Sequence, residues 1–277
     1  MKTRFKFSSG ISESLQGSRL ARAARAAVLA GFGLLPLSGV AQTKGVAPPP
    51  GLVAWWRGEG TARDSAGGAD GILYRGVTFA AGKVGRCFAF DGISSGINVP
   101  DVPALALTNS LTVEGWLFVP SAPLVPGMVL FRGDTRPGLD PYYVSVEPQA
   151  GTSGMLNFVV WNADNINTSI SAPMPLGVWT HIAATLDNCG GLMRLYTNAV
   201  VAAETNTTIR PLGALDPNYQ PGIGIGNHSS QPSPFNYPFH GLIDELSVYN
   251  RALSPNEVQA IYRAGSAGKG PLPPNPI

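Results

Sequence analysis

The stretch HGLIDELSVYNRALSPNEVQAIYRAG (residues 240–265) contains a strand-like apolar run followed by a helix with its own start and stop signals. Ser254 can cap the helix, Pro255 suits its first position, and Glu257 completes a capping box. Gly265 suits the C-terminal stop. The stretch therefore predicts one short helix that docks on β-structure through its apolar face, which carries Val258, Ile261 and Tyr262.

Strand signals dominate the chain before this helix. Short runs rich in Val, Ile, Thr and aromatic residues are separated by Gly, Pro, Asn and Asp. In LTVEGWLFVP (residues 111–120), an apolar face of odd-numbered positions alternates with a mixed face that includes Glu114 and Trp116. We expect roughly twelve to fifteen strands in an antiparallel sandwich.

The first 41 residues have the layout of a secretory signal peptide, with a basic front, an apolar run and small residues before the expected cleavage point. An uncleaved membrane anchor and a start codon further in are the alternatives. We expect a single domain over residues 51–265. The Pro-rich segments 42–50 and 266–277 are expected to be extended linkers that pack against nothing.

The basic character of the chain belongs to this leader. The whole chain has 19 Lys and Arg against 17 Asp and Glu, and residues 1–41 hold six of the former and one of the latter. The remainder therefore has 13 against 16, which gives no general case for a nucleic-acid partner. We expect a secreted protein, extracellular or periplasmic, that has no membrane partner after signal cleavage.

The two cysteines, Cys87 and Cys189, favour one disulfide in an exported chain. Closing a loop of about 100 residues would contribute up to about 4.7 kcal/mol in the chain-entropy model. Two separate free thiols are the alternative.

Six segments resemble the laminin G-like jelly roll of the concanavalin A-like lectin/glucanase superfamily, in its bacterial secreted form. In chain order, the segments are GLVAWWRGEG, DSAGGADGIL, GKVGRCFAFDGISSGINVPD, LTNSLTVEGWLFV, WTHIAATLD and FHGLIDELSVYNRALSPNEVQAIY. The resemblance implies an all-β fold, a two-sheet antiparallel jelly-roll sandwich with one short C-terminal helix. One departure is MRLYTNAVV, where Ala199 follows Asn198 in place of the usual Gly and indicates a turn other than type I′.

The adjacent acids Asp244 and Glu245 do not match the glucanase pattern of this superfamily. Alternation along a strand would point them to opposite faces, with Asp244 on the apolar face of Leu246 and Val248. A retaining glycosidase needs two carboxylates about 5–5.5 Å apart in one cleft. No other catalytic motif occurs, so we expect no enzymatic activity and name no catalytic residue.

The resemblance also implies a structural calcium ion near the seam of the first and last strands. It offers Asp64 and Asp244, with Glu59 and Asp70 as further ligands. The alternative is that Asp64 only closes an Asx-turn and that Asp244 only accepts hydrogen bonds from backbone N–H groups or Arg251. We expect no other cofactor.

Two loops carry the aromatic, amide and carboxylate groups that sugar recognition needs. They are WNADNINTS (residues 161–169) and GNHSSQPSPFNYPFH (residues 226–240). The candidate ligand-binding residues are Trp161, Asn162, Asp164, Asn165, His228 and Tyr237.

These observations favour a secreted, non-catalytic binding module whose partner is an extracellular polysaccharide or cell-surface glycan. The alternative is a structural or adhesion module that binds a cell-surface protein and has no sugar site. A glycan-active enzyme is the outside alternative.

Overall fold

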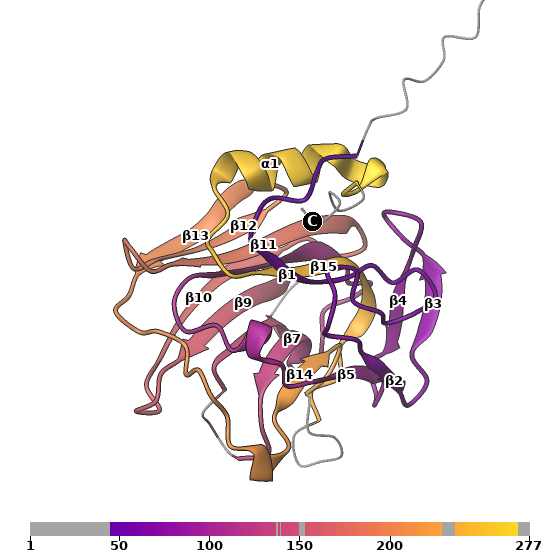
Figure 1. Ribbon diagram of the computed structural model, residues 1–277. Coiled ribbons are helices and arrows are strands. Elements are labelled where there is room, and N and C mark those ends of the chain that lie inside the picture. Colours follow the sequence, from indigo (N-terminus) through magenta and orange to yellow (C-terminus); the bar gives the residue numbers. More distant parts are fainter. Residues whose placement is uncertain (1–44, 137, 139, 150–152, 229–235, 271–277) are drawn as a thin grey trace, which may run out of the picture. The chain divides into compact units, whose positions relative to one another are not determined.

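The computed structural model describes residues 45–136, 138, 140–149, 153–228 and 236–270. The predicted signal peptide lies outside the described residues. Fifteen strands in this part of the chain form two antiparallel sheets (Figure 1). The predicted all-β jelly-roll sandwich with one short C-terminal helix is confirmed.

The first sheet has eight strands in the order β13-β12-β11-β6-β15-β4-β3, with β1 paired to β15. The first and last strands therefore lie side by side. The bounds are β1 Leu52–Trp56, β3 Thr78–Ala81, β4 Arg86–Asp91, β6 Leu111–Phe118, β11 Trp179–Asp187, β12 Leu192–Thr197, β13 Val200–Asn206 and β15 His240–Tyr249.

The second sheet has seven strands in the order β10-β9-β8-β7-β14-β5-β2. Their bounds are β2 Ile72–Tyr74, β5 Gly96–Pro100, β7 Gly127–Gly133, β8 Tyr142–Glu147, β9 Gly154–Trp161, β10 Asn167–Met174 and β14 Gly222–Ile225. Three short 3-10 helices, Pro103–Leu105, Pro217–Tyr219 and Gly265–Ala267, complete the described elements.

The main core lies between the two sheets. The odd-numbered face of β6 contributes Leu111, Val113 and Leu117, as the alternation predicts. The second sheet contributes alternate side chains such as Tyr142 and Phe158. The neighbouring positions of β8 and β9 therefore point to the outer face of the second sheet.

The helix α1 (Pro255–Ala264) closes the outer face of the first sheet (Figure 1). Its capping box at Ser254 and Glu257 forms as predicted. Val258 and Ile261 join a second apolar cluster with side chains of β11, β12 and β15, and Tyr262 stacks on Trp116 with ring centroids 5.7 Å apart. This face is consequently unavailable to a ligand along the helix.

The segments on either side of the domain pack together. Val46 pairs with Lys269 in a parallel bridge, and the Lys269 side chain is almost fully buried. The expectation that both segments pack against nothing was therefore wrong for residues 45–50 and 266–270. Lys269 also supplies a positive charge to buried carboxylates, which are described below.

The β12–β13 hairpin differs from the sequence prediction. Thr197 pairs with Val200, so the turn has two residues, and both Asn198 (φ 50°) and Ala199 (φ 64°) are left-handed. The turn thus has the positive φ angles of type I′, and the predicted different turn was wrong. Ala199 keeps its methyl group against the apolar cluster under α1, which explains how a non-glycine residue is accepted there.

We predict that Ala199→Gly stabilises the protein by about 0.5–1 kcal/mol. Left-handed backbone costs an alanine about 1–2 kcal/mol, and glycine removes this strain while losing one partly buried methyl group. Urea unfolding would measure the gain, and Ala252→Gly, outside the hairpin, provides a control that should not stabilise. A lower unfolding free energy for Ala199→Gly would contradict the account.

Candidate functional site

The acidic pair in β15 lies at a β-bulge. Asp244 pairs with Trp116 and Ser247 with Glu114, so Glu245 and Leu246 share one partner residue, Gly115, on β6. Glu245 has a left-handed φ of 56°, and the extra residue at the bulge shifts by one position which side chains of β15 point to each face of the sheet. A Cβ added to Gly115 would lie 3.2 Å from the carbonyl oxygen of Asp244, which favours glycine opposite the bulge.

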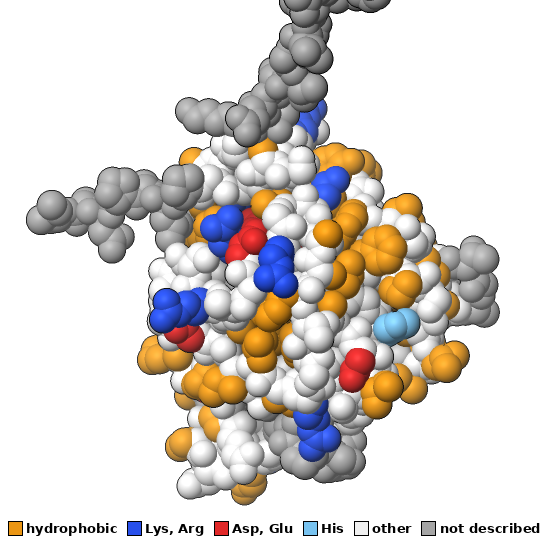
Figure 2. Space-filling model, turned by 90° about the vertical axis from the view of Figure 1, so that its right-hand side faces the viewer, with side chains coloured by type: hydrophobic (Ala, Val, Ile, Leu, Met, Phe, Trp, Pro, Cys, Tyr) orange, Lys and Arg blue, Asp and Glu red, His pale blue; other side chains and the backbone are white. Residues whose placement is uncertain are grey.

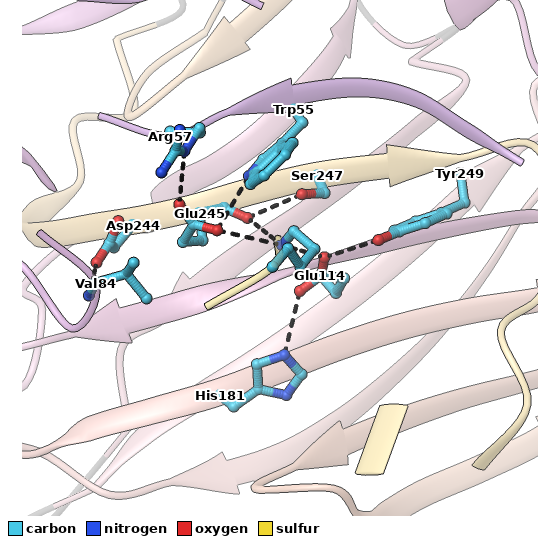
Figure 3. A network of polar contacts seen from close by, with 10 residues as sticks. Trp55, Arg57, Val84, Glu114, His181, Asp244, Glu245, Ser247 and Tyr249 are labelled. Carbon is cyan, nitrogen blue, oxygen red and sulfur yellow. Dashed lines mark hydrogen bonds and ion pairs between the residues drawn. The ribbon is translucent and has the colours of Figure 1, made fainter. Parts of the chain in front are cut away.

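The predicted sidedness of Asp244 was wrong for this reason. Ile243, Leu246 and Val248 belong to the core between the sheets, whereas the buried carboxylates of Asp244 and Glu245 contact groups outside that core (Figure 3). The argument that alternation separates the pair therefore fails. The two carboxylates have separate scaffold contacts: Asp244 accepts from the N–H of Val84, and Glu245 accepts from Trp55 and Arg57.

Glu245 accepts hydrogen bonds from side chains of β1 and its continuation. Its Oε2 accepts from the indole N–H of Trp55 at 3.2 Å, and its Oε1 from Arg57 at 3.4 Å (Figure 3). Lys269 Nζ donates to the Glu245 carbonyl oxygen at 3.2 Å and lies 3.8 Å from Oε2. These contacts tie the bulge to both ends of the domain.

Glu114 on β6 forms the second half of the same buried ion network, which comprises Glu114, His181, Glu245, Tyr249 and Lys269. Lys269 Nζ donates to Glu114 Oε1 at 2.9 Å, and Tyr249 donates to the same oxygen at 3.3 Å. His181 Nε2 lies 3.2 Å from Oε2 (Figure 3). Burial alone would raise the pKa of Glu114, but Lys269 and His181 lower it to about 2. The network is a structural feature beneath α1.

The four predicted calcium ligands do not form one set. Asp64 accepts from the backbone N–H groups of Trp55, Ala66 and Ala69, and Asp70 accepts from the N–H of Asp64. Glu59 and Asp244 instead accept from the turn before β4, through the N–H groups of Arg86 and Val84.

The described residues contain no group of three or more His, Cys, Asp or Glu that could hold a metal ion. The proposed four-residue set therefore does not fit calcium in this arrangement, and the backbone contacts are those of the alternative interpretation. Calcium binding at Asp64, Asp244, Glu59 and Asp70 stays a prediction.

The predicted disulfide between Cys87 and Cys189 was wrong. Both cysteines are free; Cys87 is buried on β4 and Cys189 is exposed after β11. Two strands, β6 and β15, separate β4 from β11, which places the strands about 14 Å apart at the usual spacing. A disulfide needs Cα atoms within about 7 Å.

A hollow of about 440 Å³ lies on the outer face of the second sheet. It is bounded by β7, β8, the loop between them and the loop after β14. Its lining includes Met128, Phe131, Arg136, Gly138, Asp140, Tyr143, Glu147, His228 and Tyr237. The volume falls in the range of small-molecule sites.

Aromatic rings form much of this hollow. Phe131 stacks against Tyr143 with centroids 6.2 Å apart, and His228 lies over Phe131 at 3.7 Å. Burial lowers the pKa of His228 to about 4, so its ring is neutral at pH 7. Burial raises the pKa of Tyr143 to about 12, which keeps its hydroxyl group protonated and able to donate.

The loop after β14 is held against β7 by backbone contacts. The Tyr237 carbonyl accepts from the N–H of Met128 at 3.0 Å, and the Tyr237 N–H donates to Asn227 Oδ1 at 2.9 Å. Tyr237 is consequently fixed at the edge of the hollow. Residues 229–235 of this loop lie outside the described residues.

The structure brings the predicted ligand-binding residues together only in part. His228 and Tyr237 line the hollow. Trp161 ends β9 beside Tyr143, its diagonal neighbour across the β8–β9 pair, and adjoins the lining without belonging to it. Asn165 lies against Gly138 at the rim of the hollow. A Cβ added to Gly138 would lie 2.6 Å from Asn165 Oδ1.

Asn162 and Asp164 build the β9–β10 turn. Asn162 Oδ1 accepts from the N–H groups of Asp164 and Ile166 at 3.0 and 2.9 Å. Asn162 therefore shapes the turn and has little capacity left for a ligand, whereas Asp164 is exposed beside the hollow rather than in it.

Sequence reasoning missed Phe131, Arg136, Asp140, Tyr143 and Glu147. A signal was present: in YYVSVE (residues 142–147) every second position carries Tyr, Ser and Glu, which is typical of an outward face. The preceding loop, rich in Gly, Asp, Arg and Pro, joins this face to β7.

A family model described as the concanavalin A-like lectin/glucanases superfamily matches residues 91–259. This range covers β5 to β15 and the first half of α1, and it includes the hollow and the bulge. No match was found among curated proteins.

Several solved structures have a similar fold. Domain 4 of AbnA, a GH43 extracellular arabinanase from Geobacillus stearothermophilus, in complex with arabinotriose, is 23% identical, with a TM-score of 0.54; 75% of this chain and 96% of that chain are covered. The binding domain of botulinum neurotoxin serotype G is 15% identical, with a TM-score of 0.58 and coverages of 76% and 50%.

The binding domain of botulinum neurotoxin DC, in complex with SialylT, is 12% identical, with a TM-score of 0.57 and coverages of 78% and 52%. This chain thus spans about half of the neurotoxin binding domains. At these identities the likeness shows the fold. Within the described residues, no helix is long and apolar enough to cross a membrane.

We predict that Lys269→Met lowers the free energy of unfolding by about 3 kcal/mol or more, because it leaves Glu114 and Glu245 as uncompensated buried carboxylates. Arg194→Met is the matched control, since Arg194 pairs with the exposed Glu204 and should cost less than about 1 kcal/mol. Equal losses in urea unfolding would show that the network is not the anchor.

We predict that Asp244→Asn raises stability, and more so at alkaline pH. Burial raises the pKa of Asp244 to about 7, with Glu245 and Glu59 adding to the rise, while Val84 still donates to the side chain. A raised carboxyl pKa means that stability is lost as pH rises from about 4 to 7. The gain should be about 2 kcal/mol larger at pH 8 than at pH 5.

Thermal melts at both pH values, with calcium and then with chelator, would measure this effect. If Asp244 were a calcium ligand, Asp244→Asn would instead lower the melting temperature in calcium, and chelator would lower that of the wild type. An unchanged wild-type melt in chelator would remove the calcium hypothesis.

Proposed function

Because the chain belongs to the concanavalin A-like lectin/glucanases superfamily, we propose that it is a secreted, non-catalytic module that binds an extracellular polysaccharide or cell-surface glycan. The observation that carries this proposal is the hollow on the outer face of the second sheet. It combines stacked aromatic side chains with carboxyl, hydroxyl and guanidinium groups at one place.

The chemistry of the hollow suits a sugar ring. Pyranose rings present C–H groups that pack on aromatic faces, while their hydroxyl groups need donors and acceptors around the edge. Tyr143 and Tyr237 supply both kinds of contact, and Asp140 and Glu147 supply acceptors. The complexes of related folds with arabinotriose and with SialylT support a glycan as the class of ligand.

A protein partner is the competing function. The face beside β2, β3 and β4 carries hydrophobic side chains scattered among polar atoms and several charged side chains (Figure 2). Exposed apolar residues of this region include Ile72 and Ile93. Scattered single residues are normal on a protein surface, so this observation favours a protein partner less than the aromatic hollow favours a glycan.

We predict that residues 42–277 bind one class of glycan in a panel of polysaccharides and oligosaccharides, with saturation in calorimetry. Tyr143→Ala and Trp161→Ala should each weaken binding about fivefold or more, since each removes an aromatic surface worth about 1 kcal/mol or more. Trp179→Ala is the control, because Trp179 is also half-buried at a strand end but lies on the first sheet.

The same samples would be assayed for new reducing ends, and none are expected from a non-catalytic module. Binding that survives Tyr143→Ala and Trp161→Ala would place the site elsewhere. If no glycan in the panel binds, the proposed glycan-binding function would be contradicted, and the protein-partner alternative would be favoured.

A further inference from the structure

The hollow is lined by more negative than positive groups. Asp140 and Glu147 belong to its lining, and Arg136 is its one cationic side chain among the described lining residues. Arg136 is already committed: its Nε lies 3.1 Å from both carboxylate oxygens of the buried Asp134. That pair is neutral overall, so Glu147 and the ionised form of Asp140 decide the sign of the field in the hollow.

Among the described lining residues, no further positive charge compensates these two carboxyl groups. The neighbouring His228 is neutral at pH 7, because burial lowers its pKa to about 4. Burial, together with the charge of Asp134, raises the pKa of Asp140 to about 7. The raised pKa of Asp140 is that of a carboxyl group with no cation beside it, and a bound cation would lower this pKa again.

Asp140 also has acceptor capacity to spare. Its Oδ1 is buried and has no hydrogen-bond partner among the described residues. A buried carboxyl oxygen without a donor costs free energy that a ligand donor would recover. Glu147 uses one oxygen to accept from Ser145, which leaves its other oxygen for the hollow.

The rings beside these carboxyl groups suit the same kind of ligand. Tyr143 and Tyr237 line the hollow with Asp140 and Glu147. The faces of aromatic rings attract a cation, by about 2 kcal/mol when the contact is desolvated, and carboxylates next to the rings add hydrogen bonds. Aromatic rings and unpaired carboxyl groups together form a typical ammonium site.

We infer that the hollow selects a glycan that carries a protonated amino group, an amino sugar without its acetyl group, over acetylated and acidic counterparts. This inference rests on the proposed glycan-binding function and names its ligand class. Acidic glycans are disfavoured because a carboxylate entering the hollow meets Asp140 and Glu147 with no free cation to pair with.

The test compares three oligosaccharides of equal length by calorimetry at pH 7 and low salt: oligomers of glucosamine, N-acetylglucosamine and galacturonate. Free amines of this kind, like the α-amino group, are less basic than lysine but are protonated to a substantial extent at pH 7. We expect the glucosamine oligomer to bind wild-type protein about tenfold or more tightly than the acetylated oligomer, and the galacturonate oligomer not to bind. Asp140→Asn and Glu147→Gln should each reduce this preference to about threefold or less.

Asp164→Asn is the matched control. Asp164 is an exposed carboxylate on the adjacent β9–β10 turn, outside the lining, and its removal changes the net charge equally. Preference retained in Asp164→Asn and lost in Asp140→Asn would show local selection rather than general attraction of a cation to an acidic protein. Thermal melts of each variant establish that it is folded.

The outcomes separate the inference from the function on which it rests. Equal or tighter binding of the acetylated oligomer, still lost in Tyr143→Ala, would overturn the amino-group inference and leave glycan binding intact. An equal fall for both ligands in Asp140→Asn and Glu147→Gln would also overturn it. Failure of these oligomers and of the wider panel to bind would overturn both.

Discussion

The contact of Lys269 with Glu114 and Glu245 is the interaction on which the arrangement of this domain depends. One ammonium group from the C-terminal segment lies between carboxylates of β6 and β15, both almost fully buried. A buried charge is tolerated only when it is paired, so the three groups require one another. The same segment pairs with Val46, and the network thereby joins both ends of the domain to the centre of the first sheet.

This anchoring decides which surface remains for a ligand. The network, Trp55 and α1 together cover much of the outer face of the first sheet, and the two inner faces form the core. In the part of the chain that the structure describes, the outer face of the second sheet carries no such helix over β7 and β8, and there the aromatic and acidic side chains gather in the hollow. The location of the proposed site therefore follows from how the scaffold is closed.

Local sequence signals predicted the parts of the fold that depend on neighbours in the chain. The capping box of α1 and the two faces of β6 are found as expected, whereas the pairing of the first and last strands was implied only by the family resemblance. The bulge at Glu245 was missed because no glycine marks its left-handed position; the permissive glycine, Gly115, lies on the partner strand. Similarly, local turn rules disfavour a left-handed alanine at position 199. The contact of its methyl group with the cluster under α1 partly offsets this cost.

The candidate site was harder to predict because its members meet only through sheet pairing. His228 and Tyr237 were found from their loop composition, whereas Phe131 and Tyr143 join them through the β7–β8 pair and the contacts of the loop after β14. Trp161, the most conspicuous aromatic residue of the candidate loops, only adjoins the hollow. Loop composition thus pointed to two residues of the hollow, and strand register supplies the others.

The most direct test of the central claim is a crystal structure of the domain with a bound oligosaccharide. The account predicts density for a sugar ring in the hollow between β7, β8 and the loop after β14, in contact with Tyr143 and Tyr237. A sugar bound instead beside Trp55, Arg57 and Lys269, where a second hollow lies near the ion network, would contradict it.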